Sequence, residues 1–247
     1  MQSRVMDYFK KYFEVLNHGF DRIVSEEREQ IEAAGKYIAE WLSKDENNLL
    51  YVIGTGEHST LATNELYKRA GGMPCVYPIF SEAANYERVS GMIKKDFDKL
   101  NIPKGAPIII ASHVGMNTYT IETAHLCREK GLFVIGVEAT EILAKLPEDF
   151  AGWSAEKSTL REFCDITIDH KTPFGDATIK MDGIDCPVGP VSNILIFAIM
   201  HLIELATYEH MARIGFQPPI YISGNIPGGD EHNATFNEKY RDLVKFW

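Results

Sequence analysis

Two short loops contain residues whose types and spacing suit the binding of a small anion. The first loop, residues 54–59, reads GTGEHS, and the second, residues 112–118, reads SHVGMNT. Glycines let a backbone turn sharply and approach a ligand closely. Hydroxyl groups and the free N–H groups of a following helix bind anions, phosphate above all. The candidate ligand-binding residues are Gly54, Thr55, Gly56, His58 and Ser59 in the first loop, and Ser112, Gly115, Asn117 and Thr118 in the second.

Two histidines, His58 and His113, lie within these loops. Histidine is the side chain whose ordinary pKa lets it gain or lose a proton near neutral pH. Each of the two could contact a ligand, or could be a loop histidine satisfied by its neighbours. A plain strand-to-helix connection also uses glycines and a serine cap. The position of the loops in the fold therefore decides whether they indicate a ligand site.

The elements around the loops predict that position. Each loop follows an unbroken apolar run and precedes a helical pattern, and Ser59 is the expected N-cap of the first helix. Such runs are typical of strands buried on both faces of a sheet, and their alternation with helices predicts an α/β fold. We expect a doubly wound, mainly parallel five-stranded sheet flanked by helices, Rossmann-like, with ligands at the carboxyl ends of the strands. The predicted strands are residues 49–53, 74–80, 107–111, 132–137 and 163–169.

The chain is predicted to be one domain, residues 1–247, in three regions. Residues 1–48 form an N-terminal helical extension, in which Gly19 ends or interrupts the first helix and Ser25 caps the second. Residues 49–213 form the α/β core, and residues 214–247 form a polar, glycine-rich tail that ends as a helix. The expected helices are residues 6–18, 25–44, 59–70 with a C-cap at Gly71 and Gly72, about 86–100, 118–130 and 190–213, and a hairpin covers residues 177–188.

Composition narrows the class of partner. The 247 residues carry a formal net charge of −10, which argues against a nucleic-acid or anionic-membrane partner. The longest apolar run, residues 194–200, is far below the length of a membrane span, and the N-terminus is too charged for a signal peptide. Four widely separated cysteines have no metal-site spacing and indicate reduced thiols in a cytoplasmic protein. We therefore expect no metal and no cofactor.

Three further motifs give the chain a family resemblance. They are Arg69-Ala70-Gly71-Gly72, Gly175-Asp176-Ala177 and Gly228-Gly229-Asp230-Glu231-His232-Asn233. With the two loops, they resemble the SIS (sugar isomerase) domain family, and most of all its stand-alone bacterial phosphosugar-binding proteins, which are related to phosphoheptose isomerases. The resemblance covers nearly the whole chain. One departure is Val114, which stands where the family's second loop usually offers a hydroxyl group.

The resemblance implies that the protein binds a phosphorylated or other anionic sugar derivative, and that it is a candidate aldose–ketose phosphosugar isomerase. Isomerisation needs a base and an acid, and the resemblance points to Glu65, His113 and His232. Glu65 could instead form a surface pair with Arg69. The other candidates, His201 and Glu204, lie in an apolar helix and are interpreted as structural.

Two other functions remain open. The first is a non-catalytic phosphosugar-binding or sensing role, because SIS domains serve both purposes and a fold does not settle function. The second is a dinucleotide-binding oxidoreductase, because Gly54, Gly56 and Glu82 imitate part of a dinucleotide fingerprint, although Ser59 stands at the third glycine position.

The sequence also predicts self-association. The helix at residues 190–213 is apolar on nearly every face, and the N-terminal helices carry aromatic residues. Such surfaces are usually buried against a sheet or a second subunit. Together with the resemblance, they predict a homodimer with the ligand site close to the interface.

Overall fold

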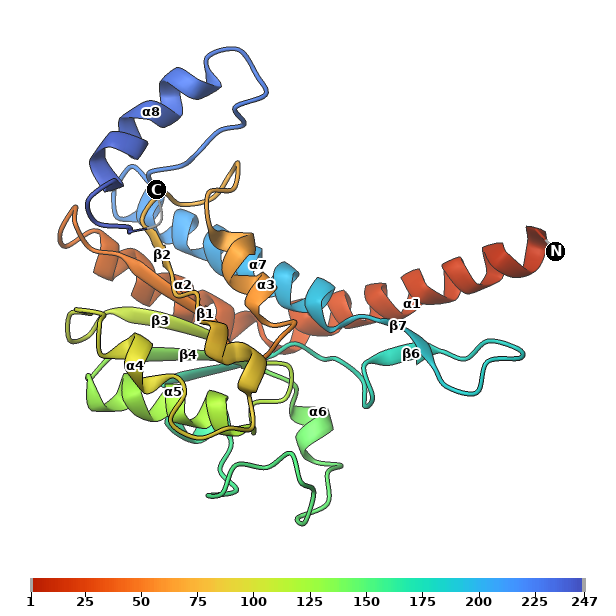
Figure 1. Ribbon diagram of the computed structural model, residues 1–247. Coiled ribbons are helices and arrows are strands. Elements are labelled where there is room, and N and C mark those ends of the chain that lie inside the picture. The colour runs from red at the N-terminus through yellow and green to blue at the C-terminus, as the bar shows by residue number, and fades with distance from the viewer. Residues whose placement is uncertain (1, 246–247) are drawn as a thin grey trace.

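A parallel sheet forms the centre of the computed structural model, which describes residues 2–245 (Figure 1). Its strand order is β2-β1-β3-β4-β5, and every neighbouring pair is parallel. The prediction of a five-stranded, mainly parallel sheet flanked by helices is confirmed. The strands are β1 (Leu50–Gly54), β2 (Val76–Pro78), β3 (Pro107–Ala111), β4 (Phe133–Glu138) and β5 (Ile166–Asp169).

The register of the central strands brings the two predicted loops to one edge. Both β1 and β3 are buried along their whole length, as their unbroken apolar sequences predict. Gly54 at the end of β1 lies beside Ala111 at the end of β3, and Ala111 lies beside Val137 of β4. The loops that follow β1 and β3 therefore start side by side at the carboxyl edge of the sheet.

Helices cover both faces of the sheet (Figure 1). One face carries α2 (Arg28–Leu42), α3 (Thr60–Leu66) and α7 (Ser192–Arg213), and the other carries α4 (Lys94–Phe97) and α5 (Thr118–Glu129). The long helix α7 packs closely on α2, since a Cβ atom at Gly35 would lie 2.5 Å from Cβ of Ala206. By length and composition alone α7 could cross a membrane, although 44% of its most apolar window is buried inside the protein and a core helix can pass the same test.

The first helix differs from the prediction. Instead of ending near Gly19, α1 continues over Gln2–Glu26. Gly19 does not end the helix. It leaves space for the side chain of Leu195, because a Cβ atom at Gly19 would lie 2.7 Å from Cδ2 of Leu195. Ser25 does not cap α2 either, since its hydroxyl donates to the carbonyl of Asp21 within α1.

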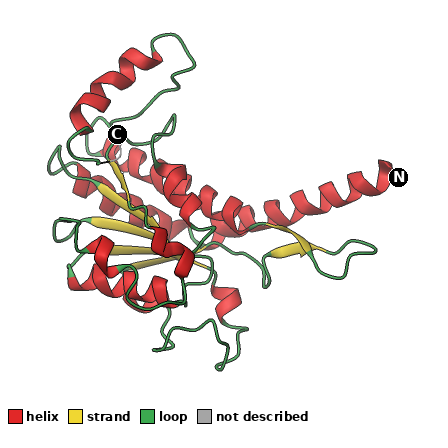
Figure 2. Cartoon of the chain, viewed as in Figure 1, coloured by secondary structure: helices red, strands yellow, loops and turns green. Residues whose placement is uncertain are grey.

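The N-terminal part of α1 projects from the body of the molecule as an arm (Figure 2). The antiparallel hairpin β6 (Ala177–Ile179) and β7 (Val188–Pro190) lies against this arm, and its presence confirms the predicted hairpin. The Tyr12 hydroxyl of α1 donates to the carbonyl of Pro190 at 2.7 Å.

Helix α3 ends earlier than its pattern predicts. It stops at Leu66, so Gly71 and Gly72 do not form its C-cap. They pair instead with the tail, where Gly71 N–H donates to the carbonyl of Tyr221 at 2.7 Å and Tyr221 N–H donates to that of Gly72 at 3.0 Å. The tail then forms α8 (Gly229–Tyr240). In place of the helix expected near residues 86–100, the chain forms a short helical turn, η1 (Glu82–Tyr86), and the short helix α4. Two further short elements are α6 (Thr140–Leu143) and η2 (Leu160–Phe163).

Candidate functional site

A pocket of about 500 Å³ opens at the carboxyl edge of the sheet, between the two predicted loops. Of the predicted ligand-binding residues, Gly54, Gly115 and Thr118 belong to the loops but do not line the pocket. The predicted residues that line it are Thr55, Gly56, His58, Ser59, Ser112, His113 and Asn117.

Thr120, which the sequence analysis did not single out, joins the two loops beneath the pocket. Its hydroxyl donates to Thr55 Oγ1 at 2.8 Å and lies 3.3 Å from Ser112 Oγ. Ser112 Oγ also accepts the N–H of Gly115 at 3.0 Å. The hydroxyls of Thr55 and Ser112 therefore stabilise the loops. Ser59 stands at the N-cap position of α3 but makes no capping hydrogen bond, which corrects the predicted cap.

A carboxylate that the sequence analysis missed lies between the loops. Glu87 lines the pocket, and its Oε2 atom accepts a hydrogen bond from Asn117 Nδ2 at 3.1 Å. Asn117 also caps α5, since its side-chain oxygen accepts the N–H of Thr120 at 2.8 Å. Gly56 has a φ of 138°, and a Cβ atom there would lie 3.0 Å from Glu87 Oε2. The absence of a side chain at Gly56 thus lets the carboxylate approach the first loop.

His113 is the histidine of the second loop, and it lines the pocket. Burial lowers its pKa below the ordinary value and His58 lowers it further, while Asp176 opposes them. Its Nε2 atom is buried and has no hydrogen-bond partner among the described residues. The imidazole is therefore neutral near pH 7, and Nε2 lies beneath the pocket surface as a buried, unsatisfied ring nitrogen.

Asp176, of the Gly-Asp-Ala motif, forms the pocket wall next to α7. Its Oδ1 atom accepts the N–H groups of Val191 at 2.9 Å and Ser192 at 2.8 Å, and Oδ2 accepts the Ser192 hydroxyl at 2.9 Å. Two backbone N–H groups at the start of α7 are thus satisfied by this carboxylate, and its negative charge on this wall disfavours an anion there.

Apolar side chains form the remaining wall. Phe150 is 38% exposed and Phe174 is 51% exposed, although both line the pocket. Val114, at the position where the resemblance leads one to expect a hydroxyl group, belongs to this wall. The full apolar wall consists of Val114, Met116, Ile142, Leu146, Phe150 and Phe174.

Glu138 lies beneath the second loop, at the end of β4. Its Oε1 atom accepts a hydrogen bond from Arg161 Nε at 2.6 Å, and its Oε2 atom is buried with no partner among the described residues. Burial raises the pKa of Glu138 to about 7, against the opposing effect of Arg161. Gly115 has a φ of 80°, and a Cβ atom there would lie 2.1 Å from Glu138 Oε2.

Glu65 does not line the pocket. Its Oε1 atom lies 3.0 Å from Arg69 Nη2, so the surface pair named as the alternative is present. The same atom lies 3.0 Å from His201 Nε2, and His201 Nδ1 lies 3.0 Å from Glu204 Oε2. The carboxylates of Glu204 and Glu65 raise the pKa of His201. The sequence predicted only a structural role for His201. Its contact with Glu65 joins α7 to α3, and no local sequence pattern reports such a contact between helices.

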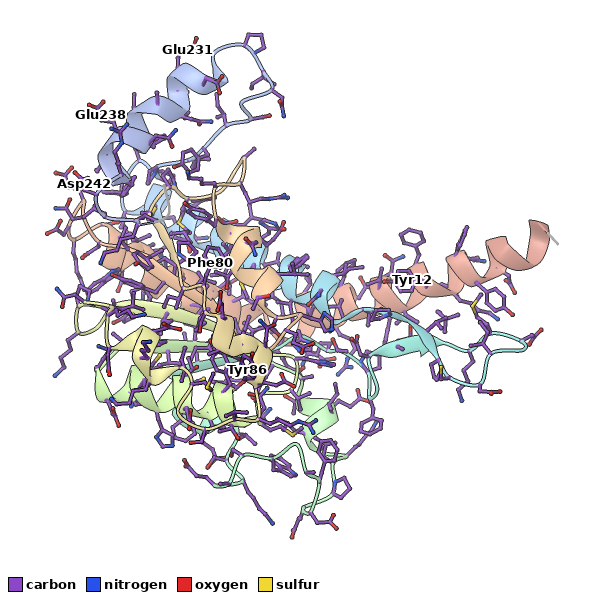
Figure 3. All side chains as sticks on the ribbon, viewed as in Figure 1. Tyr12, Phe80, Tyr86, Glu231, Glu238 and Asp242 are labelled. Carbon is purple, nitrogen blue, oxygen red and sulfur yellow. The ribbon has the colours of Figure 1, made fainter. Side chains whose placement is uncertain are left out.

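The structure places His232 away from the loops. It lies in α8, and its Nε2 atom is 2.9 Å from the carbonyl oxygen of Ile220. Figure 3 shows its neighbour Glu231 on α8, well apart from Tyr86, which precedes Glu87. The pocket of one chain therefore contains only His113 among the three predicted catalytic residues.

The chain is similar to a known protein family, to relatives of nearly the same length and to a solved structure. The model of the SIS domain matches residues 11–139. A UPF0309 protein of Thermoanaerobacter pseudethanolicus is 33% identical, and the match covers 95% of this chain and 98% of the relative. A UPF0309 protein of Caldanaerobacter subterraneus subsp. tengcongensis is 34% identical, with the same shares of 95% and 98%. A phosphoheptose isomerase from Francisella tularensis has a similar fold, with a TM-score of 0.54 at 13% identity over 81% of this chain and 97% of that one.

Proposed function

Because the chain belongs to the SIS domain family and to the UPF0309 proteins, we propose that its pocket binds a phosphorylated or otherwise anionic sugar derivative. The observation that carries the proposal is the meeting of both glycine-containing loops around one cavity at the carboxyl edge of the sheet. Arg88 is the one described lining residue with a permanent positive charge. Arg88, the Ser59 hydroxyl and His58 are the groups that we expect to bind the anion.

We further propose that the bound sugar undergoes aldose–ketose isomerisation. A neutral imidazole can donate its N–H proton to the sugar oxygen that becomes negative during the reaction, and His113 lines the pocket in that state. Glu65 and His232 do not line the pocket of their own chain. They could act only in the pocket of a second copy, and their catalytic roles stay predictions.

A non-catalytic sensing role is the second candidate. It is favoured by the hydroxyls of Thr55 and Ser112, which hydrogen-bond within the protein instead of facing a substrate. It is also favoured by Val114, which cannot donate to a phosphate group. Proton exchange at the sugar carbons separates the two functions, because only an isomerase exchanges them.

We also propose that the protein is a cytoplasmic homodimer. Phe9 is 59% exposed and Phe13 is 62% exposed on the arm of α1, and Leu205 is 61% exposed on α7. Leu205 lines a shallow groove between α7 and the α1–α2 junction. Apolar surface of this kind is suited to an interface. Sedimentation that shows only monomer at micromolar concentration would overturn the dimer.

A thermal-shift panel tests the ligand class. A ligand at one hundred times its dissociation constant stabilises the folded state by about 2.7 kcal/mol, which corresponds to a rise of several degrees in Tm. We expect such a rise with a member of a sugar phosphate panel, a smaller one with the unphosphorylated sugar, and none with NAD. A rise with NAD alone would favour the dinucleotide-binding function, and no rise with either would refute small-molecule binding.

A further inference from the structure

Glu87 is fixed in the pocket from two directions. Its backbone carbonyl accepts the N–H of Tyr119 in the first turn of α5 at 2.9 Å. Its side-chain Oε2 atom accepts the hydrogen bond from Asn117 and approaches the backbone of Gly56. The carboxylate is therefore held by the second loop and the first turn of α5, with Gly56 of the first loop leaving space beside it, and the structure gives it no ion pair among the described residues.

The second oxygen of this carboxylate is free to act. Among the described residues, no group donates a hydrogen bond to Glu87 Oε1. Burial raises the pKa of Glu87 above its ordinary value, and the nearby Glu57 raises it further, while Arg88 and His58 oppose them. A carboxylate whose pKa is moved toward neutrality is a stronger base than an ordinary surface carboxylate.

Glu65 offers a contrast. Its Oε1 atom is contacted by both Arg69 and His201, and it lies outside the pocket. Glu87, by contrast, lines the pocket and, among the described residues, accepts a side-chain hydrogen bond from the neutral amide of Asn117 and from no cationic group.

From this geometry we infer that Glu87, and not Glu65, is the base that moves the carbon-bound proton of the sugar, an inference that rests on the proposed isomerase function. Glu87 takes the proton from C2 of the open-chain aldose. The electron pair of that C–H bond forms the C1–C2 double bond, and O1 receives a proton from His113. The enediol then loses the O2 proton to His113 while Glu87 returns its proton to C1, which gives the ketose with no outside oxidant or reductant.

The test is proton exchange in D₂O, followed by NMR at C1 of ribulose 5-phosphate, fructose 6-phosphate and sedoheptulose 7-phosphate. We expect wild type to exchange the C1 proton of at least one of them. Glu87→Gln keeps the shape of the side chain and should slow exchange at least about a hundredfold while retaining the thermal shift with the same sugar. Glu65→Gln should exchange within about threefold of wild type. Glu129→Gln, at an exposed position on α5 outside the pocket, is the matched control for loss of one carboxylate.

The outcomes distinguish a failure of the inference about Glu87 from a failure of the proposed isomerase function. No exchange by wild type with any of the three sugars refutes the isomerase function, and the role of Glu87 fails with it. Exchange that survives in Glu87→Gln but is lost in Glu65→Gln leaves the isomerase standing and overturns the inference alone. Added formate should restore exchange to Glu87→Ala, because a small carboxylate can enter the space of the missing one. Loss of both exchange and binding without rescue by formate would show a structural role and would also overturn the inference.

Discussion

Replacing Glu138 with Gln should change how the stability of the protein depends on pH. Burial raises the pKa of Glu138 to about 7 in the folded protein, from 4.5 for a free carboxyl group. A group whose pKa is raised by folding contributes stability that is fully present below its unfolded pKa. That contribution is lost as the pH rises through the folded pKa. One pKa unit corresponds to about 1.36 kcal/mol, so the loss between pH 4.5 and pH 7 is of order 3 kcal/mol.

The assay is denaturant unfolding of wild type and Glu138→Gln at a series of pH values from 5 to 8. The wild type should lose stability relative to the variant as the pH rises, and the difference should level off above pH 7. The attraction of Arg161 for the ionised carboxylate is already part of the folded pKa of Glu138, so it adds no separate slope. The lowered pKa values of His113 and His170 affect both proteins alike, so they cancel in the difference.

Glu129→Gln is the control, because it removes one exposed carboxylate outside the pocket. A flat difference between wild type and Glu138→Gln from pH 5 to 8 would refute the reasoning. It would mean that Arg161 keeps Glu138 ionised and that the ion pair outweighs burial.

Three further changes test other parts of the structure. Gly115→Ala should destabilise the protein by at least about 2 kcal/mol in denaturant unfolding, because its φ is 80° and the new Cβ would meet Glu138; an unchanged midpoint would contradict the close contact. Asp176→Ala should cost about 1–2 kcal/mol by uncapping α7, while Asp176→Asn, which keeps an acceptor oxygen, should cost less; equal losses would show that the cap is not the cause. Leu205→Glu should yield monomers in sedimentation if the exposed face of α7 is the interface, and an unchanged dimer would place the interface elsewhere.

The sequence predicts the sheet well because burial on both faces leaves a clear pattern. The residues of β3, for example, form an unbroken apolar run, and the predicted strand matches Pro107–Ala111. The position of the two loops follows from the parallel fold. The same reasoning fails for α3, which ends at Leu66, and for Gly71 and Gly72, which pair with Tyr221 instead of capping the helix. That pairing joins segments far apart in the chain, and no local pattern reports it.

The candidate site could be predicted only in part. Loop residues such as Ser59 and His113 can be recognised in the sequence by their type and by their position beside the end of a predicted strand. Glu87 does not, because it lies in an irregular segment between β2 and α4 and reaches the pocket only through contacts with α5. Thr120 was missed for a similar reason, since a threonine in the first turn of a helix has no distinctive spacing. The sequence thus reveals groups on regular elements better than groups brought in by irregular ones.

The arm of α1 and the pocket are joined by a short series of contacts. Tyr12 on the arm holds the carbonyl of Pro190 in the hairpin, and the next residues, Val191 and Ser192, are held by Asp176 at the pocket wall. If the arm has two positions that place Asp176 differently, a ligand that favours one position of Asp176 would favour one position of the arm, and by linkage a partner that holds the arm would change ligand affinity by the same factor. If, in addition, two copies are joined through their arms, binding at one pocket would change the ligand affinity of the other.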